Sequence, residues 1–213
     1  MKRFLKLAVT TLFGIILLSG GGLIAYASVK QSVTQAEPME NLLQEANTLF
    51  IEGSQTVNPQ LIQQAKNKLT VWLEANSESA DKKKVAQVLR SRANVALALN
   101  EVSLTIDDFE KSSQYEPLGE IQLGLCLLSK KMGVGLTELQ DCYQKAVTMF
   151  SNNSMDEMDI NYLIARVLSG DKAAIADYKN IVEITKDPNI LNLYQMAALE
   201  YLDESVYQKI YSE

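Results

Sequence analysis

From Met39 onward, the apolar residues of this chain recur every three or four positions, and this spacing limits the fold more than any other feature. A helix places residues three and four apart on one face, so each such stripe predicts an amphipathic helix. No stretch alternates apolar and polar residues between turn signals, so we expect no β-sheet and an all-α fold. Two clear stripes comprise Leu61, Ile62, Ala65, Leu69, Trp72 and Leu73, and then Val85, Val88, Leu89, Ala93, Ala96 and Leu97.

Local signals at helix ends divide this region into short helices. Asn58-Pro59 and Asp187-Pro188 each offer an N-cap followed by proline at the first helical position, where its missing N–H costs nothing. Capping boxes are predicted at Thr137 with Gln140 and at Ser154 with Glu157. Glycines that supply a left-handed residue at helix ends are predicted at Gly53, Gly133 and Gly170.

These signals predict ten helices joined by short connections, which favour antiparallel neighbours. The segment from Ile121 to Leu128 is apolar on nearly every side, so we expect that helix to be buried in the middle of the stack. The ten expected ranges are 39–52, 59–75, 80–99, 101–114, 118–132, 137–150, 155–168, 172–185, 189–202 and 204–211.

The first 27 residues have the composition of a membrane-targeting segment. A basic start is followed by an uncharged stretch over residues 7–27, long enough to cross a bilayer of roughly 30 Å as a helix. An Ala-x-Ala pattern places a signal cleavage site between Ala27 and Ser28, so the segment is either a retained anchor, which we favour, or a cleaved signal peptide. In both cases residues 28–213 are expected outside the cytoplasm, with 28–38 as a linker and 39–213 as the helical domain.

Charge and composition exclude several classes of function. Three of the 20 basic residues precede the apolar run and no acid does, so residues 28–213 carry 17 basic and 26 acidic side chains. This balance opposes binding to nucleic acid, which requires clustered Lys and Arg. The chain has no histidine, so the usual catalytic triads and zinc ligand sets are excluded. We expect no cofactor, no metal and no catalytic residue.

Aromatic residues mark a repeat along the second half of the chain. Phe109, Tyr143 and Tyr178 lie 34 and then 35 residues apart, within the range of helical repeat periods. The segment 105–117 resembles the end of a tetratricopeptide repeat, with Phe109 as its large residue and Pro117 closing it. The segment from Leu123-Gly124 through Gly133 and Gly135 to Tyr143-Gln144-Lys145-Ala146 resembles a Sel1-like repeat, and a weaker unit runs from Tyr162 to Pro188.

This resemblance implies a short right-handed solenoid of antiparallel hairpins, in which each hairpin buries what its neighbour exposes. Small residues in one helix admit large residues from another, which gives a set of repeat-packing positions. The set comprises Phe109, Gly124, Tyr143, Ala146, Ala174 and Tyr178. Proteins with such repeats commonly act as adaptors, so the resemblance implies a protein or peptide partner.

Cys126 and Cys142 are the only cysteines, and they lie at equal distances from the glycines of the expected turn. A hairpin turning there brings them to one height, which permits a disulfide in an oxidising compartment. Helix axes about 8–10 Å apart argue against the bond, because it needs closely spaced Cα atoms. Both a disulfide and a pair of small buried thiols are therefore open, with the thiols favoured.

The expected function is a non-enzymatic, membrane-tethered scaffold or assembly factor on the outer side of the cytoplasmic membrane. Two alternatives remain at this point: a cell-wall-acting hydrolase or its regulatory subunit, and a stoichiometric inhibitor of the immunity type. The hydrolase requires an acidic residue held in a cleft with a raised pKa. The acids of residues 155–159 are expected to complement a helix dipole and not to bind calcium, because the ligand pattern of a calcium loop is missing.

Overall fold

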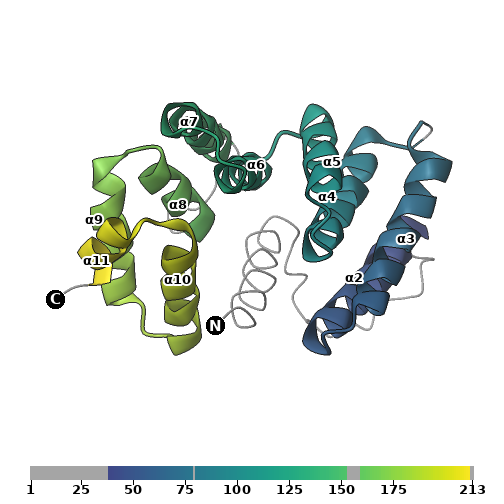
Figure 1. The fold of residues 1–213 in the computed structure, drawn as a ribbon, viewed down its shortest axis with the longest axis horizontal. Helices are drawn as coiled ribbons and strands as arrows, with labels where there is room; N and C mark the ends of the chain where they lie inside the picture. The colour runs from purple at the N-terminus through teal and green to yellow at the C-terminus, as the bar shows by residue number, and fades with distance from the viewer. Residues whose placement is uncertain (1–37, 79, 153–158, 212–213) are drawn as a thin grey trace, which may run out of the picture. The chain divides into compact units, whose positions relative to one another are not determined.

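The computed structural model of the chain describes residues 38–78, 80–152 and 159–211. These ranges contain ten α-helices and no strand, which confirms the predicted all-α class (Figure 1). They form two compact units, an N-terminal unit of residues 38–116 and a C-terminal unit of residues 117–211. The helices are α2 (Pro38–Gln55), α3 (Pro59–Asn76), α4 (Lys82–Ala98), α5 (Val102–Tyr115), α6 (Gly119–Lys131), α7 (Leu136–Asn152), α8 (Ile160–Leu168), α9 (Lys172–Ile184), α10 (Pro188–Tyr201) and α11 (Glu204–Tyr211).

Several helix ends follow the predicted signals. The Asn58 side chain accepts a hydrogen bond from the Gln60 amide at 3.1 Å, and Asp187 accepts one from the Asn189 amide at 2.8 Å. Each cap is followed by proline at the first helical position, which confirms both predicted starts. Gly133 and Gly170 have φ angles of +87° and +90°, so both supply the left-handed residue that the sequence predicted there.

The turn between α2 and α3 differs from the prediction. Helix α2 continues through Gly53 to Gln55, and the left-handed residue is Val57, with a φ angle of +54°. Gly53 serves close packing instead, because a Cβ atom there would lie 2.7 Å from Cγ1 of Ile62. The glycine therefore lets α3 approach α2, and a β-branched residue takes the unfavourable backbone conformation.

Helix α8 also starts later than residue 155, the predicted start. Asp159 has extended backbone angles and accepts hydrogen bonds from the amides of Asn161 and Tyr162, at 2.8 and 3.2 Å. It therefore caps a helix that begins at Ile160. The predicted capping box of Ser154 and Glu157 lies outside the described residues. Thr137, predicted as a cap, lies inside α7, which begins one residue earlier.

In the N-terminal unit, each helix packs on the next one along the chain, and α2 also packs on α4. The side chains between them form a single apolar core, with half-buried Trp72 and Tyr115 at its edge. The core therefore depends on both hairpins of the unit. Its buried members are Met39, Ala46, Ile62, Ala65, Leu69, Leu73, Val85, Val88, Leu89 and Val95.

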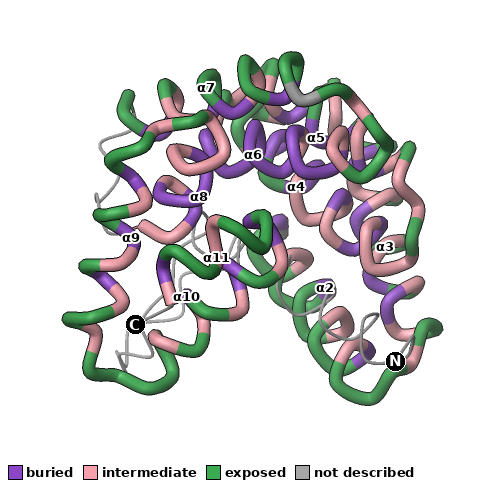
Figure 2. The backbone as a smooth tube through the Cα atoms, turned by 60° about the vertical axis from the view of Figure 1, so that its left-hand side comes forward, coloured by how far each residue is buried: buried purple, intermediate pink, exposed green. Residues whose placement is uncertain are grey.

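In the C-terminal unit, helix α6 is the most deeply buried element. Its residues 119–124 and 126–128 are buried, and Figure 2 colours most of this helix as buried. This confirms the burial predicted from its composition. Helix α6 packs on α7 and α8, and further contacts join α7 to α8, α8 to α9, α8 to α10, α9 to α11 and α10 to α11. Within each unit, the main packing therefore joins helices that are adjacent or next but one along the chain.

No helix in the described ranges combines the length and the apolar composition needed to cross a membrane. The predicted membrane segment of residues 7–27, with its cleavage site between Ala27 and Ser28, lies outside those ranges. So does nearly all of the predicted linker of residues 28–38. These assignments remain predictions from the sequence.

Candidate functional site

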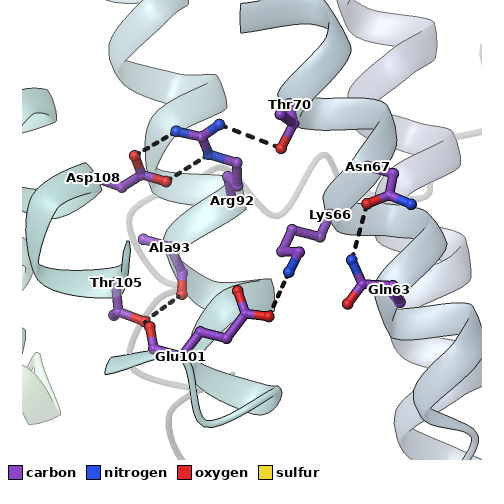
Figure 3. A network of polar contacts seen from close by, with 9 residues as sticks. All are labelled: Gln63, Lys66, Asn67, Thr70, Arg92, Ala93, Glu101, Thr105 and Asp108. Carbon is purple, nitrogen blue, oxygen red and sulfur yellow. Dashed lines mark hydrogen bonds and ion pairs between the residues drawn. The ribbon is translucent and has the colours of Figure 1, made fainter. Parts of the chain in front are cut away.

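An arginine–carboxylate pair crosses the interior of the N-terminal unit (Figure 3). Arg92 on α4 donates from Nε and Nη2 to the two carboxylate oxygens of Asp108 on α5, each at 2.8 Å, and from Nη1 to the Thr70 hydroxyl on α3 at 3.3 Å. The Asp108 side chain is 4% exposed and that of Arg92 16%. One guanidinium therefore connects three helices through oriented, charge-assisted hydrogen bonds.

The local electrostatics favour the charged state of Arg92. The hydrogen bonds to Asp108 raise the pKa of Arg92 above its ordinary value, although burial acts in the opposite direction. A buried ion pair contributes little net stability compared with apolar packing, but its directional hydrogen bonds permit only one alignment of the helices. The pair is therefore best understood as a device that sets the positions of α3, α4 and α5.

Two further contacts complete the network around this pair. Lys66 on α3 forms an ion pair with Glu101 at the start of α5, as Figure 3 shows. Arg90 on α4 donates to Glu116 just after α5 at 2.8 Å. The side chains of Lys66 and Arg90 are mostly buried and those of Glu101 and Glu116 partly exposed, so these ion pairs join the helices at the edge of the unit.

The surface of the same unit carries a shallow, open depression of ≈ 500 Å³. It is lined mainly by exposed polar side chains of α2, together with Lys68 of α3, whose Nζ lies 2.8 Å from Oε2 of Glu45. The depression therefore presents side-chain amides, a hydroxyl and an ion pair next to the apolar side chain of one leucine. Its lining residues are Asn41, Gln44, Glu45, Thr48, Leu49 and Lys68.

The predicted repeat-packing residues all lie inside the two units. The aromatic members Phe109, Tyr143 and Tyr178 are at most 3% exposed, and the small members Gly124, Ala146 and Ala174 are buried as well. They are packing residues of helices α5, α6, α7 and α9, and none of them lines the depression. Any binding surface must therefore be built from other side chains.

Several tyrosines of the C-terminal unit are buried, and one of them makes a polar contact between two helices. The Tyr178 hydroxyl donates to the carbonyl oxygen of Tyr194 at 2.6 Å, and the two rings meet edge to face at 5.6 Å. Burial raises the pKa of Tyr178 and Tyr201 well above the ordinary value, and raises the pKa of Tyr143 to about 12. These buried hydroxyls therefore stay neutral to a higher pH than an exposed tyrosine does.

The two cysteines are joined in a disulfide between α6 and α7. Their Cα atoms are 5.7 Å apart, closer than the typical spacing of helix axes that argued against the bond. The described residues hold no free cysteine, so the buried thiol pair that the sequence favoured is not what the structure has.

Sequence reasoning missed two charged clusters. The Arg92–Asp108 pair has a signal in the sequence, because Asp108 lies on the stripe of Thr105, Phe109 and Ser112, all of which are buried. On α8, Arg166 donates to Asp171 and Asp177, each at 2.8 Å, and a hydrogen bond from Arg166 lowers the pKa of Asp171. A general acid needs a raised pKa, so this second cluster has the opposite character.

No three His, Cys, Asp or Glu side chains of the described ranges lie together as a metal site would require. Comparisons of the chain with protein-family models, with curated proteins and with solved structures gave no match.

Proposed function

We propose that this protein is a non-enzymatic, membrane-tethered scaffold that binds a protein or peptide partner on the extracytoplasmic side of the cell envelope. The observation that carries the proposal is the order of helix packing, because the main contacts within each unit join helices that are adjacent or next but one along the chain. Hairpins stacked in this way form a short solenoid of the tetratricopeptide or Sel1-like type, and solenoids offer extended surfaces for partners. The uncharged segment of residues 7–27 is the proposed tether.

The proposed contact surface is the exposed face of α2 around the depression. Gln44 and Asn41 offer amide donors and acceptors, and Leu49 offers an apolar contact beside them. Ile51, on the next turn of α2, is 42% exposed. A face of amides with isolated apolar side chains fits an extended peptide, whose backbone needs hydrogen bonds and whose side chains need shallow apolar contacts.

Site-specific photo-crosslinking in the native envelope tests this proposal. A crosslinker at Gln44 on the proposed face is compared with one at Gln64, an exposed glutamine on α3 outside the depression. We expect one discrete adduct from position 44 and none from position 64. After the captured protein has been purified, Lys68→Glu should weaken its binding to the full chain, because the substitution reverses a charge at the edge of the depression.

Two results would contradict the scaffold. The first is identical adducts from both positions, which indicates random collision. The second is degradation of peptidoglycan by the purified full chain, which would establish the hydrolase that the sequence left open.

A further inference from the structure

The disulfide ties the most buried helix of the C-terminal unit to its neighbour. Cys126 on α6 is fully buried, whereas Cys142 on α7 is partly exposed. The distance of 5.7 Å between their Cα atoms lies within the range of unstrained disulfides. The Gln122 amide, one turn before Cys126, lies 3.6 Å from Sγ of Cys126 and 3.2 Å from Sγ of Cys142. The Gln122 amide therefore contacts both sulfurs of the bond between the two helices.

The turn that joins these helices does little to fix their register. It contains Gly133 and Gly135, and a Cβ atom added at either position would meet no other atom within 4 Å. An open turn with two glycines leaves the unfolded chain many conformations, which a crosslink across it removes. The bond spans a sequence separation of 16, so it constrains both helices of the hairpin.

We propose that the Cys126–Cys142 bond is a redox-dependent staple of the C-terminal unit alone. The unit reaches full stability only where thiols are oxidised, and the N-terminal unit has the same stability in either thiol state. Both cysteines of the chain belong to the C-terminal unit, whereas the N-terminal unit is fixed by ion pairs that thiol chemistry does not touch. The proposal does not depend on the scaffold function.

The exchange chemistry follows from the exposure of the two sulfurs. A thiolate of a dithiol reductant attacks the more accessible Sγ of Cys142, forms a mixed disulfide there and releases the Cys126 thiolate. The second thiol of the reductant then displaces Cys142, so two protein thiols form and the reductant becomes a disulfide. When the bond forms, a small disulfide such as glutathione disulfide oxidises the two cysteine thiols. It accepts their two electrons and leaves as two thiols.

The chain's own chromophores report the two units separately. Trp72 on α3 is the only tryptophan, so its fluorescence reports the N-terminal unit. Seven of the nine tyrosines lie between residues 143 and 211, so tyrosine circular dichroism in the near ultraviolet reports mainly the C-terminal unit. Both signals can be followed in one urea titration of the full chain in detergent, with and without a dithiol reductant.

We expect the reductant to move the tyrosine transition to lower urea, with roughly a hundredfold rise in the unfolding constant of that unit, as loop closure predicts for a loop of about 15 residues. The tryptophan transition should stay where it is. Alkylation of the unreduced, denatured protein followed by mass spectrometry should modify no cysteine, and modification of two cysteines after reduction should accompany the shift.

Two variants separate the bond from other changes in α6. Cys126→Ala/Cys142→Ala should unfold at the same urea concentration with and without reductant. Ser129→Ala, which changes a small polar residue one turn after Cys126, should keep the full response. The proposal is overturned by two alkylated cysteines in protein that has been exposed to glutathione disulfide, by a tyrosine transition that reductant does not move, or by equal shifts of both transitions.

Discussion

The two units of this protein are both built from helical hairpins, but they fix their helices by different means. In the N-terminal unit, charge pairs of Arg92 and Arg90 join α4 to α5 and to Glu116 just after it, and a hydrogen bond from Arg92 joins α4 to α3. In the C-terminal unit, a disulfide joins α6 to α7 and a hydroxyl of a buried tyrosine joins α9 to α10. The same hairpin geometry is thus compatible with ionic, covalent and aromatic contacts between helices.

The difference teaches that packing order and packing chemistry are separable. Apolar stripes decide which faces meet, and they do so in both units. The polar or covalent contact then selects one register among several that the stripes allow. An ionic contact responds to removal of one partner, a disulfide responds to the redox state, and buried phenols respond to alkaline pH. The units should therefore fail under different conditions.

The largest expected effect comes from a substitution that should destabilise the N-terminal unit and leave the C-terminal unit unchanged. Asp108→Ala leaves the Arg92 charge buried without its carboxylate, which should lower the free energy of unfolding of the N-terminal unit by about 3 kcal/mol. The measurement is urea unfolding followed by the fluorescence of Trp72. The neighbouring exposed Asp107→Ala should change that value by less than about 0.5 kcal/mol. If Asp108→Ala moved the urea transition of the tyrosine signal and not that of the tryptophan signal, the pair would not be what stabilises the N-terminal unit.

Alkaline pH should destabilise the C-terminal unit. Burial raises the pKa of Tyr143, Tyr178 and Tyr201, so these phenols ionise in the unfolded chain before they ionise in the folded one. The folded state then holds more protons, and stability falls as pH rises above the unfolded value of about 10. Between about pH 10 and 11, each of these tyrosines should cost about 1 kcal/mol.

The alkaline effect can be measured by urea unfolding near pH 8 and near pH 11, followed by far-ultraviolet circular dichroism, with Trp72 fluorescence identifying the N-terminal transition. The control is Tyr178→Phe, which removes one ionisable phenol and should reduce the alkaline loss. If the N-terminal unit lost more stability at high pH than the C-terminal unit, the effect could not be assigned to the buried tyrosines of the C-terminal unit.

A glycine contact should show how tightly α6 is packed. A Cβ atom at Gly119 would lie 2.5 Å from Cγ of Phe150, which is fully buried. Gly119→Ala should therefore destabilise the C-terminal unit by about 1–3 kcal/mol, as overpacking usually does. Gly135→Ala places its methyl group in open space and is the matched control in the near-ultraviolet measurement. Equal effects of the two substitutions would show that α6 has room to move.

The smallest expected effect is a gain in stability at the first turn. Val57 is 71% exposed and has a φ angle of +54°, which a β-branched residue adopts only with strain. Val57→Asn should stabilise the N-terminal unit by about 0.5–1 kcal/mol, because asparagine tolerates this conformation. Val71→Asn on the exposed face of α3 should give no gain. A loss at position 57 would mean that the valine makes a contact worth more than its strain.

The sequence was sufficient for the elements because their signals are local. Asn58 and Asp187 each precede a proline, and each caps its helix as predicted, since a cap needs only residues within one turn. The burial of α6 followed from its composition alone. The predicted glycine turn at Gly53 was wrong because its role depends on Ile62, a residue of the next helix.

The site was harder to predict because its contacts cross between helices. Asp108 is an acid on a buried stripe, and its partner Arg92 lies on another helix at a distance that no local pattern reports. The disulfide was judged from a typical spacing of helix axes, whereas α6 and α7 bring Cys126 and Cys142 closer than that value. The depression on α2 is a property of exposed side chains, which hydrophobic periodicity does not describe.

The packing order described above also bears on how the chain folds as it emerges from the ribosome. Because the main contacts join helices one or two apart along the chain, few long loops must close, and chains of this kind fold quickly. Each helix can dock once the next two have emerged. Two lysines of α6 make contacts over a longer range: Nζ of Lys130 lies 3.3 Å from the Tyr201 carbonyl oxygen and 3.6 Å from the Asp203 carboxylate, and Nζ of Lys131 lies 3.5 Å from the Glu200 carboxylate. These contacts can form only after the helices between α6 and the end of α10 have been made.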